Sequence, residues 1–222
     1  LAYVFPEIAA EWHPTKNGKL IPDKVLPGAA KKVWWKCKKG HSWSATIARR
    51  TLTKSGCVYC ANLKVSKTNN LQAISPKLAK EWHPTKNGNL TPAEVVAGSS
   101  KKVWWKCPKG PDHEWLVSII SRIRGTNCPF CSGKKLSVTN SLQAMYPEIA
   151  KQWYQSKNGE LSPDKIVSGS KKRVWWKCTN GPDHEWKTTP HHRVKGGTNC
   201  PFCSGKKVSV TNSLQALYPE IA

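Results

Sequence analysis

The sequence of 222 residues predicts small α+β modules in a tandem array of three. One supporting observation is an internal repeat of about 70 residues, a period typical of tandem units. The nine cysteines also fall three to a repeat, with none left over. A module of this length has a small apolar core and usually needs a metal or disulfide staple. We therefore expect repeats over residues 1–70, 71–141 and 142–213, with residues 214–222 beginning a truncated fourth repeat.

Each repeat is expected to open with a short amphipathic helix. In the first repeat a proline falls in the first helical turn, and Ile8 and Trp12 lie four residues apart on one face. An Asn-Gly pair then ends the helix in a turn. The motif LIPDKV follows, and its proline predicts a single helical turn.

The motif VWWKC, present in all three repeats, predicts a strand. Adjacent side chains on a strand point to opposite faces, so Trp34 and Trp35 cannot share an environment. One tryptophan should fill the small core. Two roles stay open for the other: packing on the neighbouring helix, or stacking on a base as in proteins that bind single strands.

The cysteines and histidines predict a metal site in each repeat, in the order Cys, His, Cys-x-x-Cys. Three thiols cannot all pair as disulfides within one repeat, and a histidine as fourth ligand gives the spacing of structural zinc sites. Four protein ligands leave no open position, so we expect three structural zinc ions rather than catalytic ones. The predicted ligands are Cys37, His41, Cys57 and Cys60; Cys107, His113, Cys128 and Cys131; and Cys178, His184, Cys200 and Cys203.

A second short helix, of about two turns, is expected between the histidine and the cysteine pair. Thr46, Ser118 and Thr189 are good N-cap residues for it. The framework around this helix hardly changes between repeats, whereas its first positions change completely. Such variation is typical of a modular reader of base edges in the major groove, although drift at exposed positions would look the same. The predicted base-reading residues are Ser44, Ile47, Ala48, Arg49, Leu116, Ile119, Ile120, Ser121, Lys187, Pro190, His191 and His192.

The net charge of +23 is spread over all three repeats. Such a surface favours a polyanionic partner, and basic residues that recur in every repeat suit phosphate contacts. A solvated basic surface without a partner is the alternative. The predicted phosphate-binding residues are Lys31, Lys32, Lys36, Arg50, Lys101, Lys102, Lys106, Arg122, Lys171, Lys172, Lys177 and Arg193.

Several motifs together carry a family resemblance over nearly the whole chain: EWHPTKNG, KKVWWKC, GHSW or DHEW, the arginine of the second helix, and CPFC. On these residues the chain resembles the tandem zinc-ribbon or treble-clef zinc-finger repeats of bacterial and large-virus proteins. The resemblance implies nucleic-acid binding, sometimes beside a nuclease-like domain. Val58 and Tyr59 depart from the Pro-Phe of the family's knuckle, but neither is a predicted ligand.

These observations predict a monomeric, sequence-selective binder of duplex DNA that contacts about three base pairs per repeat. Structured RNA as the partner, a targeting segment of a nuclease, and a scaffold for protein interactions are the alternatives. We expect no enzyme and no small-molecule substrate, because no repeated carboxylate pair, nucleophile with a base or phosphate loop is visible; Glu11 and Glu81 correspond to Gln152.

The sequence has no signal-peptide pattern at its start and no apolar run of about 18 residues. We therefore expect no membrane partner. Thiols that serve as metal ligands also favour a reducing compartment inside the cell, either the cytoplasm or the nucleus.

Overall fold

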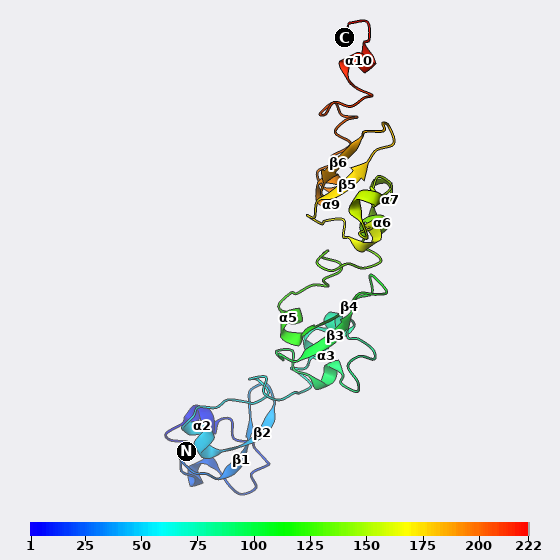
Figure 1. Ribbon diagram of the computed structural model, residues 1–222. Helices are drawn as coiled ribbons and strands as arrows, with labels where there is room; N and C mark the ends of the chain where they lie inside the picture. Colours follow the sequence, from blue (N-terminus) through cyan, green and yellow to red (C-terminus); the bar gives the residue numbers. More distant parts are fainter. Residues whose placement is uncertain (222) are drawn as a thin grey trace. The chain divides into compact units, whose positions relative to one another are not determined.

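The computed structural model describes residues 1–221 (Figure 1). It divides into two compact units: Leu1–Trp104 with Leu116–Gly125, and Trp105–Trp115 with the chain from Thr126 onward. The junction between the first two repeats lies inside the first unit, and the next junction lies inside the second. The domain boundaries that the repeats suggest stay a prediction.

All three repeats share five short elements in the same order: a helix that begins with proline, a 3₁₀ turn, two strands and a second helix. The first has α1 (Pro6–Ala9), the 3₁₀ turn η1 (Pro22–Lys24), β1 (Lys32–Lys36), β2 (Ser42–Thr46) and α2 (Ile47–Thr51). The second has α3 (Leu71–Ile74), α4 (Pro76–Ala79), η2 (Pro92–Glu94), β3 (Lys102–Lys106), β4 (Glu114–Ser118) and α5 (Ile119–Ile123). The third has α6 (Leu142–Met145), α7 (Pro147–Ala150), α8 (Gln155–Asn158), η3 (Pro163–Lys165), β5 (Val174–Lys177), β6 (Glu185–Thr188) and α9 (Pro190–Val194), and α10 (Leu214–Leu217) follows it. The predicted class of small α+β modules is confirmed.

The strands form three separate two-stranded sheets: β1 with β2, β3 with β4, and β5 with β6. In the first, antiparallel sheet, Trp35 lies opposite Trp43. An isolated pair of strands is marginally stable in water, so these sheets need support from other segments. An antiparallel bridge between Trp12 and Trp35 brings the segment after α1 against β1 and supplies part of this support.

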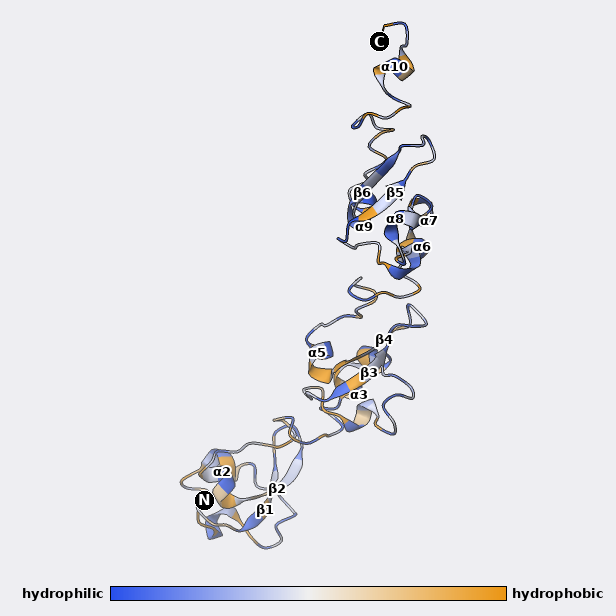
Figure 2. Ribbon diagram, in the orientation of Figure 1, coloured by the Kyte–Doolittle hydropathy of each residue, from blue (hydrophilic) through white to orange (hydrophobic). Residues whose placement is uncertain are grey.

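The second tryptophan of each VWWKC motif forms the centre of its core. Trp35, Trp105 and Trp176 are each 0% exposed. In the first repeat the ring of Trp12 meets that of Trp35 edge-on, with 5.4 Å between centroids, which is a favourable aromatic geometry. Figure 2 shows hydrophobic residues on β3 and α5 beside hydrophilic loops, as expected for small cores.

The first tryptophan of the motif lies on the outer face of the strand. Trp34 is 38% exposed, and Lys16 Nζ lies 4.5 Å from its ring centroid. The side-chain amide of Asn17 pairs with the backbone of Trp34, donating to its carbonyl at 2.9 Å and accepting from its N–H at 2.8 Å. The asparagine of the Asn-Gly pair thus covers the open edge of β1 as well as forming a turn.

The helices α2, α5 and α9 begin where the sequence predicts. The hydroxyls of Thr46, Ser118 and Thr189 accept hydrogen bonds from the backbone N–H groups three residues later. Each helix has only five residues, so the expected length of two turns is an overestimate. Within residues 1–221, no helix combines the length and apolar character needed to cross a bilayer.

Candidate metal centres and nucleic-acid interface

The structure brings the four predicted metal ligands of each repeat together. In every group the Sγ and histidine ring nitrogen atoms lie within 4.8 Å of one another. In the first repeat, Cys37 directly follows β1 and His41 directly precedes β2, so the sheet fixes this half of the site. The Cys-x-x-Cys pair arrives after α2, and the other two repeats use the same arrangement.

The distances between the donor atoms fit tetrahedral zinc. With Zn–S near 2.3 Å and Zn–N near 2.05 Å, a tetrahedron has S···S edges of about 3.8 Å and S···N edges of about 3.6 Å. The observed Sγ···Sγ distances are 3.8 Å for Cys37 and Cys60 and 3.7 Å for Cys107 and Cys131. His41 Nδ1 lies 3.5, 3.6 and 3.4 Å from the Sγ atoms of its three cysteines. Three thiolates and the histidine Nδ1 would therefore hold the ion.

The pKa values of the last cysteine in each group reflect the same crowding. Burial, together with hydrogen bonding to Cys107 and Cys128, raises the pKa of Cys131 to about 12. Burial and the neighbouring thiols raise the pKa of Cys60 and Cys203 to about 11. A divalent cation among the thiols removes this penalty, because it stabilises the thiolate form.

The other ring nitrogen of each histidine contacts hydroxyl groups that sequence reasoning missed. His113 Nε2 lies 3.0 Å from Ser137 Oγ and 2.8 Å from Thr139 Oγ1. The same pair recurs as Ser209 and Thr211 around His184 Nε2, at 3.1 and 2.8 Å. With Nδ1 facing the metal site, Nε2–H donates to these hydroxyls, which fixes the tautomer and the ring orientation. The sequence signal for these hydroxyls is the Ser-x-Thr-Asn motif, which recurs after each cysteine pair.

The asparagine of the Ser-x-Thr-Asn motif closes the loop after the cysteine pair. Asn69 Nδ2 donates to the carbonyls of Tyr59 and Lys64 at 2.7 and 2.9 Å, and its Oδ1 accepts from Ser66 N at 2.6 Å. The next residue, Asn70, caps α3 by accepting from Ala73 N at 2.8 Å. The metal loop of the first repeat therefore continues directly into the first helix of the second.

Two glycines have no side chain because the ligand histidine fills that space. A Cβ on Gly110 would lie 2.6 Å from the His113 ring, and a Cβ on Gly181 would lie 2.6 Å from the His184 ring. The His113 ring also stacks on Phe130, with ring centroids 5.1 Å apart. Both contacts restrict the position of the ring.

The three arginines predicted to contact phosphate do not reach the surface, which corrects that expectation. Arg50, Arg122 and Arg193 are 5%, 5% and 4% exposed. Arg50 forms an ion pair with Glu11, and Arg122 forms one with Glu81. Arg193 donates to Gln152 Oε1 at 2.6 Å, and burial lowers its pKa. A buried guanidinium must be paired, so these arginines link the end of the first helix region to α2, α5 and α9.

Three of the predicted base-reading residues are also buried, which excludes them from contact with bases. Ile47 and Ile119 are 0% exposed, and Pro190 is among the fully buried side chains. Those left exposed are Arg49, Leu116, Lys187 and His192, and those half-buried are Ser44, Ala48, Ile120, Ser121 and His191.

Most of the predicted phosphate-binding lysines lie on the surface. The exposed ones are Lys31, Lys32, Lys36, Lys101, Lys102, Lys171, Lys172 and Lys177. Lys106 is half-buried and pairs with Glu114 at 3.2 Å, and Lys177 pairs with Glu185 at 3.3 Å. A phosphate at either of these two positions would compete with a carboxylate.

Comparison with known families identifies the repeats. A family model described as "Probable Treble clef zinc finger domain" matches residues 8–63, 78–134 and 149–206. The chain belongs to this treble clef zinc finger family. Each repeat carries one structural zinc site, as the sequence predicts. All three matches end before the Ser-x-Thr-Asn motif, which places the hydroxyls on the ligand histidines outside the matched segments.

The chain is also similar to a protein of Escherichia phage T5 named "Putative endonuclease", with 25% identity over 103 residues. The match covers 46% of this chain and 32% of the phage protein, so it spans about a third of that relative's length. The expectation of a protein without enzymatic function is corrected by this similarity. The treble clef repeats themselves favour a nucleic-acid partner.

Proposed function

We propose that the three zinc repeats bind nucleic acid, with duplex DNA favoured over RNA, and that they direct an endonuclease to its DNA. The observation that carries the proposal is a constant zinc-held scaffold with variable residues at one place on the surface. Basic residues recur in every repeat, and the net charge of +23 suits a polyanion.

The variable surface of each repeat consists of three residues. One lies two positions before the N-cap residue of α2, α5 or α9, and the others are the second and third residues of that helix. In the third repeat these residues are Lys187, His191 and His192. Side chains in the first turn of a helix can reach base edges in the major groove. The corresponding residues differ in the other repeats, so each repeat would read different bases.

Selection from a random pool of duplex oligonucleotides tests this proposal. An enriched motif is expected, and His192→Ala should relax it at one position. Lys172→Ala should instead weaken binding to all sequences alike and reduce the salt dependence by one phosphate contact, a slope change of about 1. A pool that yields no motif would refute sequence-selective reading.

Structured RNA is the second candidate partner, favoured by the outer tryptophans. Trp34 is 38% exposed and has Lys16 over its ring, so it offers an aromatic face beside a cation. Unpaired RNA bases stack on such faces. Competition between duplex DNA and hairpin RNA of equal length separates the two, and stronger retention of RNA would favour this alternative.

The proposed link to an endonuclease can be tested with the chain itself. Purified protein is incubated with plasmid DNA and Mg²⁺, and binding and cleavage are measured in parallel. Binding without cleavage would limit these repeats to targeting. Cleavage by the 222-residue chain would show instead that it contains an active site of its own.

A further inference from the structure

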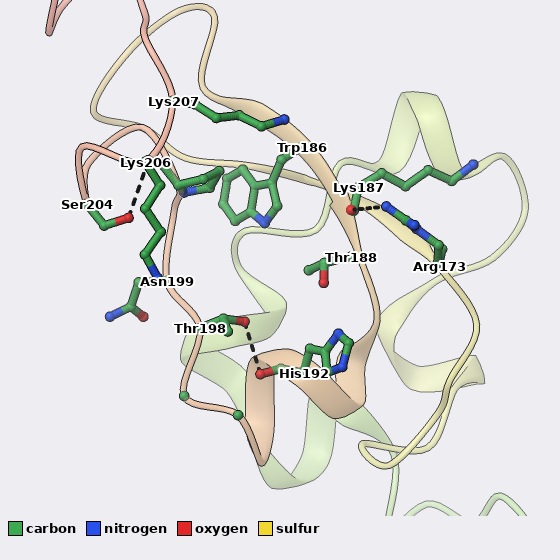
Figure 3. Close-up of a pocket in the computed structure, with 13 residues that line it drawn as sticks. Arg173, Trp186, Lys187, Thr188, His192, Thr198, Asn199, Ser204, Lys206 and Lys207 are labelled. Atoms are coloured by element: carbon green, nitrogen blue, oxygen red, sulfur yellow. Dashed lines mark hydrogen bonds between the residues drawn. The ribbon is translucent and has the colours of Figure 1, made fainter.

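The third repeat contains a basic cleft whose lining includes the proposed base-reading residues Lys187 and His192 together with three further basic residues (Figure 3). It has a volume of about 540 Å³ and lies between β6, α9 and the loop that carries Cys200 and Cys203. Figure 3 shows Lys206 extending from this loop toward Asn199. The cleft is lined by five basic residues and by neutral or polar ones, with no carboxylate among the lining residues that the structure describes. The basic residues are Arg173, Lys187, His192, Lys206 and Lys207.

The backbone holds several of these groups in place. Arg173 Nη2 donates to the carbonyl of Lys187 at 3.1 Å, which fixes the guanidinium beside β6. A guanidinium has five N–H donors, so this bond leaves donors for an anion. Thr198 Oγ1 donates to the carbonyl of His192 at 3.0 Å, and the buried Arg193 donates to the carbonyl of Thr198 at 2.9 Å. The buried arginine therefore orders the wall of the cleft without entering it.

Each of the other two repeats lacks a basic residue at two of the five corresponding positions. Where the third repeat has Lys187, the first has Ser44 and the second has Leu116. Lys206 corresponds to Leu63 in the first repeat but to Lys134 in the second, and His192 corresponds to Ser121 in the second repeat but to Arg49 in the first. Charge is thus concentrated in the third repeat at this place. A cleft lined by cations without a carboxylate suits a phosphate group, because lysine and arginine bind phosphate oxygens by charge-assisted hydrogen bonds.

We propose that this cleft binds backbone phosphates of a nucleic-acid strand and makes the third repeat the electrostatic anchor of the array. The inference rests on the proposed nucleic-acid binding and assigns a site to it. Removing phosphate contacts reduces the slope of log affinity against log salt by about 0.9 per contact on duplex DNA. Removing basic residues from the cleft should therefore reduce this slope more than removing the same number of basic residues elsewhere.

The test compares two double variants of the whole chain with equal loss of charge. Lys187→Leu with Lys206→Leu places in the cleft residues that other repeats already have there. Lys151→Ala with Lys165→Ala removes two exposed lysines of the same repeat outside the cleft. Affinity for a 20-base-pair duplex is measured from low to high salt. Zinc content and circular dichroism confirm that both variants fold.

The cleft variant should lose at least about 10-fold in affinity and about 2 from the salt slope, and the control should lose far less. Equal losses in the two variants would overturn the site but leave nucleic-acid binding intact. Absence of salt-dependent binding by the unmodified chain would instead refute the proposed function. Inorganic pyrophosphate serves as a separate probe, and tight binding to it without competition by the duplex would overturn the assignment to a strand.

Discussion

At the scale of single residues, the arginine that recurs in α2, α5 and α9 has a structural role. Arg50 lies over two tryptophan rings, with its guanidinium carbon 5.2 Å from the Trp35 centroid and 5.3 Å from that of Trp43. Its ion pair with Glu11 supplies the partner that a buried charge requires. In the third repeat the acceptor is the neutral Gln152. This difference gives a direct measure of what the carboxylate contributes.

Gln152→Glu should stabilise the third repeat by about 1 kcal/mol, because a charge-assisted hydrogen bond replaces a neutral acceptor opposite Arg193. Chemical denaturation of the zinc-loaded protein, followed by tryptophan fluorescence, measures the change. Glu81→Gln in the second repeat is the matched reverse substitution and should be destabilising. A Gln152→Glu variant of unchanged or lower stability would contradict the assigned role of the pair.

The hydroxyls on the ligand histidines give a second prediction at this scale. Ser209→Ala with Thr211→Ala should reduce the zinc affinity of the third repeat about 10- to 100-fold, because the His184 ring loses the groups that orient it. In a chelator titration, one of the three zinc ions should leave earlier than in the unmodified protein. Val210→Ala is the control, since Val210 is 63% exposed. Simultaneous loss of all three ions in both variants would speak against a positioning role.

At the scale of elements, each repeat depends on short segments that could not be stable alone. Helices of four or five residues are far too short to persist in water without tertiary packing. The two-stranded sheets are equally marginal. The zinc site joins the ends of β1 and β2 to the loop after α2, so the metal holds elements together that apolar contacts alone would not. The turn that carries the histidine is therefore sensitive to small changes.

Gly181→Ala tests this sensitivity. The added methyl group would lie 2.6 Å from the His184 ring, so the ring must move away from its ligating position. The third zinc should be bound more weakly or lost, as measured by metal content after dialysis. Gly169→Ala is the matched control, because nothing lies within 4 Å of a Cβ there. Equal zinc retention in the two variants would show that the loop accommodates the methyl group.

At the scale of the whole molecule, the junctions between repeats are built structures rather than loose linkers. Ala97 N of the second repeat donates to the carbonyl of Asn69 at the end of the first at 3.1 Å, and Asn70 forms an antiparallel bridge with Val96. The residues just after the first metal loop thus pair with the second repeat. In the next junction Ser141, the last residue of the second repeat, forms the corresponding antiparallel bridge with Val167 of the third. Loss of zinc from one repeat should therefore disturb the start of the following one.

Removal of zinc by a chelator should unfold the array, because binding of each structural ion supplies roughly 10–16 kcal/mol to folding. Circular dichroism and tryptophan fluorescence should both lose their folded signals, and three equivalents of zinc should restore them. Acidification should have the same effect, since protons compete for the thiolates and the histidine nitrogen. A folded signal that persists without metal would contradict this dependence.

Local spacing made part of this structure predictable. The cysteine and histidine order, the N-caps Thr46, Ser118 and Thr189, and the proline-initiated turns could all be inferred from sequence, because each depends on neighbours a few residues away. The roles of Arg50, Arg122 and Arg193 could not be inferred. Their acceptors lie about 40 residues earlier in the chain, and a basic residue that recurs in every repeat is equally consistent with a phosphate contact and with a buried pair.

The sequence by itself determined that this protein is an array of three zinc-held treble clef repeats with a basic surface. Only the tertiary structure decided which side chains are available to a partner. It buried Ile47, Ile119 and Pro190, exposed Trp34, and brought the Ser-x-Thr-Asn motif onto the ligand histidines. Burial and pairing depend on contacts between segments far apart in the chain, and local sequence spacing does not encode those contacts.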